Sequence, residues 1–154
     1  MSPPTTPDTT ALSAPHVLEY TYTRSVGPVI GRFFGALQQR KILGIRASDG
    51  RVLVPPMEYD PNTAEPLSEF VEVGQAGVVT AWAWVFSPRK NHPLGRPFAW
   101  ALIRLDGADS ALLHAVDAVD ESRMATGMRV RARWRAETAG EILDIECFEP
   151  EAAP

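Results

Sequence analysis

Cysteine is almost absent from this chain of 154 residues, because Cys147 is the only one. A single cysteine excludes an internal disulfide and is typical of proteins kept in a reducing compartment. Leu143 and Ile145 fall on the same face of a predicted strand as the thiol. This setting favours a small core residue over a reactive thiol.

Long apolar runs are also missing. No stretch approaches the roughly 20 apolar residues that a helix needs to cross a bilayer. The first ten residues, MSPPTTPDTT, have neither the basic start nor the apolar centre of a secretory signal. We therefore expect a cytoplasmic protein with no membrane partner.

The sequence lacks the motifs of common enzyme classes. It contains no glycine-rich phosphate-binding loop and no serine or cysteine motif of a nucleophile elbow. The histidines His16, His92 and His114 are widely separated along the chain. We expect no catalytic residues, no cofactor and no enzymatic activity of the chain by itself.

Lysine is scarce, occurring only at Lys41 and Lys90, and the net charge of the chain is −4. Such a chain has no overall field that attracts a phosphate backbone, although a local basic patch is not excluded. The hydrophobic fraction of 45% and charged fraction of 22% are those of a folded globular protein. The composition therefore favours a globular protein without a nucleic-acid partner.

The length fits one compact unit with an appendage. Residues 1–15 contain four prolines and predict a flexible tail. In residues 16–40, the alternating segment HVLEYTYTRSV predicts a strand. Gly27-Pro28 then predicts the start of a helix that runs to Gln39. Phe33 and Phe34 on this helix favour a core stripe buried against something sizeable.

Residues 41–69 predict a hairpin-like unit. Lys41–Arg46 and Arg51–Val54 have the composition of two short strands, and Ser48-Asp49-Gly50 between them is a tight-turn signal. Pro55-Pro56 ends the hairpin.

Residues 70–150 predict a small barrel. Phe70–Phe86 is expected to form one long strand with a bend or bulge at Gly77. Further strands are predicted at 98–105, 110–116, 128–136 and 141–148, with a short helical turn at 120–126. Five strands with a short helix between the third and fourth is the plan of an OB-fold. The predicted class is therefore mainly β, with an OB-fold preceded by a helix and a hairpin.

The run FFGALQQRKILGIRASDGRVLVPPMEYDP, followed by VEVGQAGVVTAWAWV, resembles the acyl-CoA-associated family called domain of unknown function 35. The resemblance covers roughly residues 27–150, and further short matches are Leu105-Asp106-Gly107 and Gly127-Met128. It implies an N-terminal helix, a rubredoxin-like zinc ribbon and an OB-fold barrel.

The resemblance also implies two Cys-x-x-Cys knuckles around Pro55-Pro56, which this chain lacks. The aligned positions are Arg46, Asp49, Asp60 and Thr63. An arginine cannot act as a ligand, and two carboxylates with a hydroxyl make a poor zinc cage. We predict a metal-free knuckle in which Arg46 pairs with Asp49 or Asp60. A hard cation held by Asp49, Asp60 and Glu58 is the less favoured alternative.

Aromatic side chains concentrate on the first two predicted barrel strands. Period-two alternation would place Thr80, Trp82 and Trp84 on one face of the first strand. Aromatics there could stack on bases, fill the barrel or form a protein interface, and the acidic charge favours the last two. The candidate interface residues are Tyr20, Tyr22, Phe33, Phe34, Trp82, Trp84 and Trp100.

Two basic features have both a binding and a neutral interpretation. Alternation places Arg129, Arg131, Arg133 and Arg135 on one face of one strand. They could bind phosphate, but a solvated face neutralised by Asp144 and Glu146 on the facing strand is favoured. The loop between the first two strands carries the candidate residues for contact with coenzyme A or a partner, which are Arg89, Lys90, His92 and Arg96. A surface loop with scattered charge is the equal alternative.

The resemblance implies a function that the residues alone do not. Members of the family accompany thiolase-superfamily enzymes, and in steroid degradation such a domain joins a thiolase-like aldolase that cleaves a steroid acyl-CoA side chain by a retro-aldol step. The leading hypothesis is a non-catalytic subunit of such a hetero-oligomer, with acyl-CoA at the interface. The alternatives are a free-standing acyl-CoA-binding protein and, less favoured, an OB-fold nucleic-acid-binding module.

Overall fold

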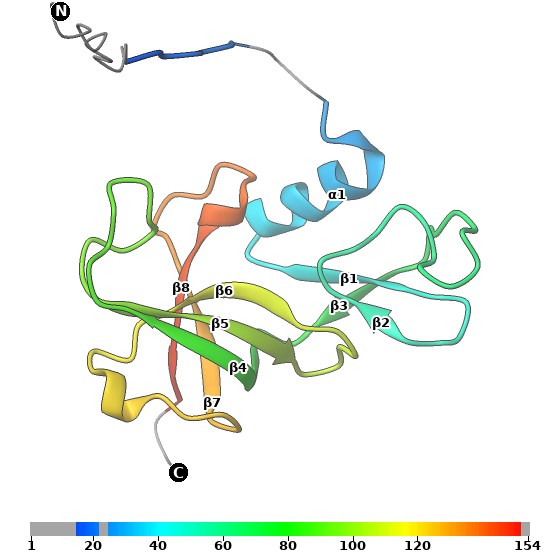
Figure 1. Ribbon diagram of the computed structural model, residues 1–154. Coiled ribbons are helices and arrows are strands. Elements are labelled where there is room, and N and C mark those ends of the chain that lie inside the picture. Colours follow the sequence, from blue (N-terminus) through cyan, green and yellow to red (C-terminus); the bar gives the residue numbers. More distant parts are fainter. Residues whose placement is uncertain (1–14, 22–24, 152–154) are drawn as a thin grey trace, which may run out of the picture.

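The computed structural model describes residues 15–21 and 25–151 and contains one α-helix, eight strands and two short 3-10 helices. A three-stranded sheet lies beside a closed barrel, and the helix lies above both (Figure 1). The elements are α1 (Gly27–Gln38), β1 (Ile42–Arg46), β2 (Val52–Leu53), β3 (Phe70–Val73), β4 (Ala76–Val85), β5 (Phe98–Leu105), β6 (Leu112–Val116), η1 (Glu121–Arg123), β7 (Arg129–Trp134), η2 (Ile142–Asp144) and β8 (Ile145–Pro150). This helix is the only α-helix among the described residues, and it is not long and apolar enough to cross a membrane.

The helix α1 forms where the sequence predicts it. Pro28 occupies its first turn, where a missing N–H costs nothing. Val29, Phe33 and Leu37 recur at helical spacing and are buried. This stripe packs on β1 and η2 and so joins the sheet to the barrel.

The strand predicted for residues 16–26 is wrong where it can be assessed. Residues 15–21 and 25–26 form no strand, and residues 22–24, including Tyr22, lie outside the described residues. No neighbouring strand supplies hydrogen bonds there, and alternation alone cannot provide them. Tyr20 is 74% exposed.

The expected single strand from Phe70 to Phe86 is two strands in two different sheets. β3 pairs with β1, with Ile42 opposite Val73, and completes the sheet order β2-β1-β3. The chain then turns at Gly74, whose N–H donates to the carbonyl of Asp106 at 2.8 Å. A Cβ at Gly74 would lie 3.0 Å from the Asp106 side chain, so the turn requires a small residue.

The barrel is closed in the order β4-β5-β6-β8-β7, with η1 between β6 and β7. This arrangement confirms the predicted OB-fold. The predicted bulge lies between Val79 and Ala81 and not at Gly77. Gly77 instead allows close approach of β5, because a Cβ there would lie 2.4 Å from the carbonyl oxygen of Arg104.

The last predicted strand begins later than expected. Residues 142–144 form η2, and β8 starts at Ile145. The Asp144 carboxylate accepts hydrogen bonds from the N–H groups of Ala139, Gly140 and Glu141 at 2.8, 2.8 and 3.2 Å. These bonds stabilise a capped turn in place of an extended start.

Candidate functional site

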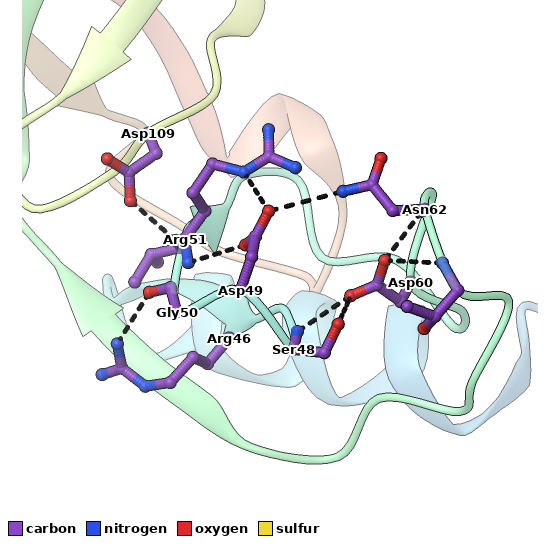
Figure 2. A network of polar contacts seen from close by, with 10 residues as sticks. Arg46, Ser48, Asp49, Gly50, Arg51, Asp60, Asn62 and Asp109 are labelled. Atoms are coloured by element: carbon purple, nitrogen blue, oxygen red, sulfur yellow. Dashed lines mark hydrogen bonds and ion pairs between the residues drawn. The ribbon is translucent and has the colours of Figure 1, made fainter.

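The knuckle where the resemblance implies zinc is held by one buried carboxylate (Figure 2). Asp60 is 2% exposed and accepts hydrogen bonds from Ser48 N at 2.8 Å and Ser48 Oγ at 2.6 Å. It also accepts from Asn62 N at 2.7 Å and Thr63 N at 3.2 Å. The Ser48 bonds above all, and then those of Asn62 and Thr63, hold the pKa of Asp60 well below its ordinary value. Asp60 therefore joins the turn at 48–50 to the loop at 60–63.

The predicted pairing of Arg46 with Asp49 or Asp60 is wrong. Arg46 Nε lies 2.7 Å from Glu69 Oε1, and Arg46 Nη1 donates to the Gly50 carbonyl at 3.1 Å. Arg46 pairs with Glu69 because the Glu69 backbone carbonyl accepts a hydrogen bond from Arg46 N, which brings the two side chains together. Asp49 pairs instead with Arg51 Nε at 2.7 Å.

The donor set at these positions does not fit zinc. The oxygens of Asp60 already accept four hydrogen bonds, and Thr63 faces Asp60 with its N–H, a group that cannot bind a metal. Among the residues that the structure describes, no group of three or more His, Cys, Asp or Glu side chains could hold a metal ion. The alternative of a hard cation between Asp49, Asp60 and Glu58 finds no support in this geometry.

Two side chains that sequence reasoning missed attach the small sheet to the barrel. Asp109 accepts from Val52 N at 2.8 Å, and Ser110 Oγ both accepts from Val54 N at 2.6 Å and donates to its carbonyl at 3.0 Å. These bonds satisfy the outer edge of β2 and the residue after it, where the described residues supply no further strand. The turn signal at 106–109 predicts the hairpin but not this contact.

The arginine stripe on β7 is neutralised, as the favoured interpretation predicts. Arg133 contacts Glu146, Glu149 and Asp117 at 2.9 to 3.1 Å. The partners of the other three are Asp106 and Glu151 for Arg129, Glu151 for Arg131 and Glu141 for Arg135. Asp144 is not one of these partners, because its carboxylate caps η2.

Two of the four candidate residues in the basic loop, Arg96 and His92, contact the barrel. Arg96 pairs with Asp117, and the His92 ring packs edge-on against Phe98 and Trp100 at 5.6 and 6.3 Å between centroids. Burial opposes the charge of Asp117, but the hydrogen bonds from Arg96 and Arg133 outweigh it and lower its pKa. Arg89 and Lys90 are exposed, and neither has an ion-pair partner in the described part of the chain.

The candidate aromatic residues serve the core more than the surface. Trp82 and Trp84 are half-buried against the barrel core, and Trp100 packs with Phe98 beneath the basic loop. The bulge at 79–81 shifts the alternation, so Thr80 lies outside while Trp82 faces inward. Trp82 and Trp84 share a face as predicted, but the prediction is wrong for Thr80, which lies on the opposite side.

An apolar groove of about 430 Å³ lies between α1 and the start of β6. Its lining is Ile30, Phe33, Phe34, Pro55, Ala111, Leu112, Leu113 and Ile142. Phe33 is buried in the floor, and Phe34 is half-buried. Exposed apolar surface of this kind is typical of a contact with another molecule.

Cys147 is fully buried, and burial raises the pKa of its thiol to about 12. It therefore stays protonated near neutral pH and is a poor nucleophile. This confirms its assignment as a core residue.

Comparison with known proteins identifies the barrel. Residues 70–135 match the family model described as ChsH2, C-terminal OB-fold domain. A solved structure named "Ltp2-ChsH2(DUF35) aldolase" has a TM-score of 0.61 at 19% identity, covering 83% of this chain and 98% of that one. A protein of unknown function from the DUF35 family of Sulfolobus solfataricus has a TM-score of 0.56 at 26% identity, covering 70% of this chain and 77% of that one. No curated protein sequence matches the chain.

Proposed function

The chain is an OB-fold protein of the domain of unknown function 35 family, and from this premise we propose that it is a non-catalytic accessory subunit of an aldolase. The proposed partner is a thiolase-like protein, and the proposed reaction is retro-aldol cleavage of a steroid acyl-CoA side chain. The likeness to a structure named as a ChsH2-containing aldolase supports the assembly.

The apolar groove beside α1 is the observation that carries the proposal. It lies at the junction of helix and barrel, and Leu113 on its rim is 58% exposed. Ahead of α1, Val17 and Tyr20 are each 74% exposed and Leu18 is 65% exposed. A partner subunit would bury these side chains and gain roughly 25 cal/mol for each Å² removed from water.

Co-expression with the thiolase-like aldolase of the same organism tests the proposal. We expect a stable hetero-oligomer in size-exclusion chromatography, and aldol cleavage only when the catalytic protein is present. Ile30→Ser at the groove should weaken the complex, whereas Gln39→Ser, an exposed change just after the same helix, should not. A chain that remains separate from this partner, or that cleaves acyl-CoA alone, would refute the proposal.

A second candidate function is acyl-CoA binding by the isolated chain. Its support is the pair of exposed cations Arg89 and Lys90, which have no ion-pair partner in the described part of the chain. Titration calorimetry with coenzyme A and a long-chain acyl-CoA would detect uptake without a partner. Arg89→Ala with Lys90→Ala should abolish that uptake, and Arg123→Ala, an exposed arginine on η1, is the matched control.

A further inference from the structure

The outer face of β4, β5 and β6 carries an exposed apolar row. The strand register places Ala81 beside Leu102 and Leu102 beside Leu113. Ala81 is exposed, Leu102 is 41% exposed and Leu113 is 58% exposed. Three neighbouring strands of the barrel thus present apolar side chains at the same level.

Local structure removes the polar groups that would normally interrupt such a row. The bulge at 79–81 leaves both Thr80 and Ala81 exposed, and Thr80 Oγ1 donates to the carbonyl of Leu102 at 3.1 Å. The hydroxyl is therefore committed to the sheet itself. The next row along the strands continues with Ala83 beside Trp100.

Cations stand at both ends of this face. Arg104 follows Leu102 on the same side of β5 and is exposed. The loop with Arg89 and Lys90 joins β4 to β5 at the opposite end of these strands (Figure 1). None of the three has an ion-pair partner among the residues that the structure describes, whereas the arginines of β7 all have one.

The width of the face also limits what can cover it. Adjacent strands lie about 4.8 Å apart, so three strands span about 10 Å, which matches the diameter of a helix. We propose that this face, defined by Ala81, Ala83, Leu102 and Leu113, binds an amphipathic helix of the catalytic subunit whose apolar stripe is bordered by carboxylates. This inference rests on the function proposed above and identifies the partner's contacting element.

A second copy of the chain fits the face less well than an acidic helix does. In a two-fold dimer through this surface, the ends bearing Arg104 and the Arg89–Lys90 loop could only meet further cations. Like charges brought together at an interface disfavour association. Aspartate or glutamate beside an apolar stripe would instead complement both ends.

The test uses the full chain and the co-expressed aldolase partner, with dissociation constants from biolayer interferometry. A81E with L102E, which leaves the groove beside α1 unchanged, should weaken binding by about 100-fold, since it places charge in the centre of an apolar contact. R104E should weaken it by about 10-fold and reduce its salt dependence. The controls M57E, at an apolar site that is 45% exposed, and R123E should stay within about twofold. All of these side chains are exposed, so melting temperatures should remain within about 2 °C of wild type.

The outcomes separate this inference from the proposed function. If wild type binds the aldolase and A81E/L102E binds equally well, the helix-binding face is refuted and the accessory role survives. If wild type itself fails to bind, both are refuted. If the isolated chain is a dimer that A81E/L102E dissociates, the face belongs to a second copy and the inference is overturned.

Discussion

The small sheet and the barrel are both built from β-strands, but different forces hold them together. The barrel encloses large side chains that are fully buried, among them Phe148, Ile103 and Val79. The ribbon-like unit, which we define as residues 42–73, has a small apolar cluster around Ile45 and Leu53. Its loops are joined by Asp60. The loops of this unit are thus closed by hydrogen bonds to a single carboxylate, whereas Ile42, Val52 and Val73 of its strands are buried in the same core as the barrel.

The largest effect is expected in the barrel. Phe148→Ala removes a ring that is 0% exposed and packs edge-on against His114 at 5.5 Å between centroids. The cavity should cost about 3 to 5 kcal/mol of the free energy of unfolding, measured with urea. Phe86→Ala is the matched control, because that ring is 69% exposed, and it should change stability by less than about 0.5 kcal/mol. Equal effects of the two would contradict the assignment of the core.

In the ribbon-like unit the corresponding change is Asp60→Ala. It leaves the N–H groups of Ser48, Asn62 and Thr63 without their acceptor, so the melting temperature should fall by roughly 4 to 8 °C. Those three amides should exchange with deuterium faster, while the Val79 amide in the barrel should not. Asp60→Asn should be intermediate, and Asp49→Ala, at an exposed side chain, should have a smaller effect than either.

The same carboxylate makes the unit sensitive to acid. Because the pKa of Asp60 is lower in the folded chain than its usual value near 4, its contribution is present above that value. It is lost as the pH falls through the folded pKa. The unit and the barrel could instead unfold together in acid, with Asp60→Asn half-unfolded at the same pH as the wild type. That result would argue against a local role of Asp60.

The structure of the barrel was easier to predict from the sequence than the structure around it. The barrel was predictable, since its strands alternate and its turns at 106–109 and 127 carry glycine or aspartate. The start of β4 was missed, because the predicted bend fell on Gly77, whereas the chain turns at Gly74, between Phe70–Val73 and Ala76–Val85. Which of the two glycines breaks the strand is decided by the bond from Gly74 N to the Asp106 carbonyl, a contact between residues distant in sequence.

In the knuckle, residue chemistry predicts a site without zinc, but it did not predict the contacts that hold the loops together. The prediction chose the arginine among the four aligned positions and expected a salt bridge. The structure uses backbone N–H groups and the Ser48 hydroxyl instead. The sequence Asp60-Pro61-Asn62 carries the signal of a turn closed by its own aspartate, which would have indicated the carboxylate as an acceptor.

A smaller effect of pH on stability is expected from a buried histidine in the barrel. His114 is 4% exposed, and burial lowers its pKa below the ordinary value of about 6.5. The unfolded chain therefore binds a proton that the folded chain resists, and stability should fall as the pH drops below about 6.5. Between pH 7.5 and 5.5 the melting temperature should decrease by roughly 1 to 3 °C. His114→Gln should remove most of this dependence, whereas His92→Gln, in the loop, should leave it intact.

Chelation should have the smallest effect and gives the sharpest view of the ribbon-like unit. A zinc-held knuckle loosens when its metal is removed, because metal binding supplies its folding energy. Here the Asp60 oxygens are occupied by four hydrogen bonds, so EDTA should change the melting temperature by less than about 1 °C. Elemental analysis of the same sample should find no stoichiometric zinc. A fall after EDTA that added zinc restores would show that a metal closes the knuckle. If the Asp60 carboxylate bound that metal, zinc would no longer raise the melting temperature of Asp60→Ala.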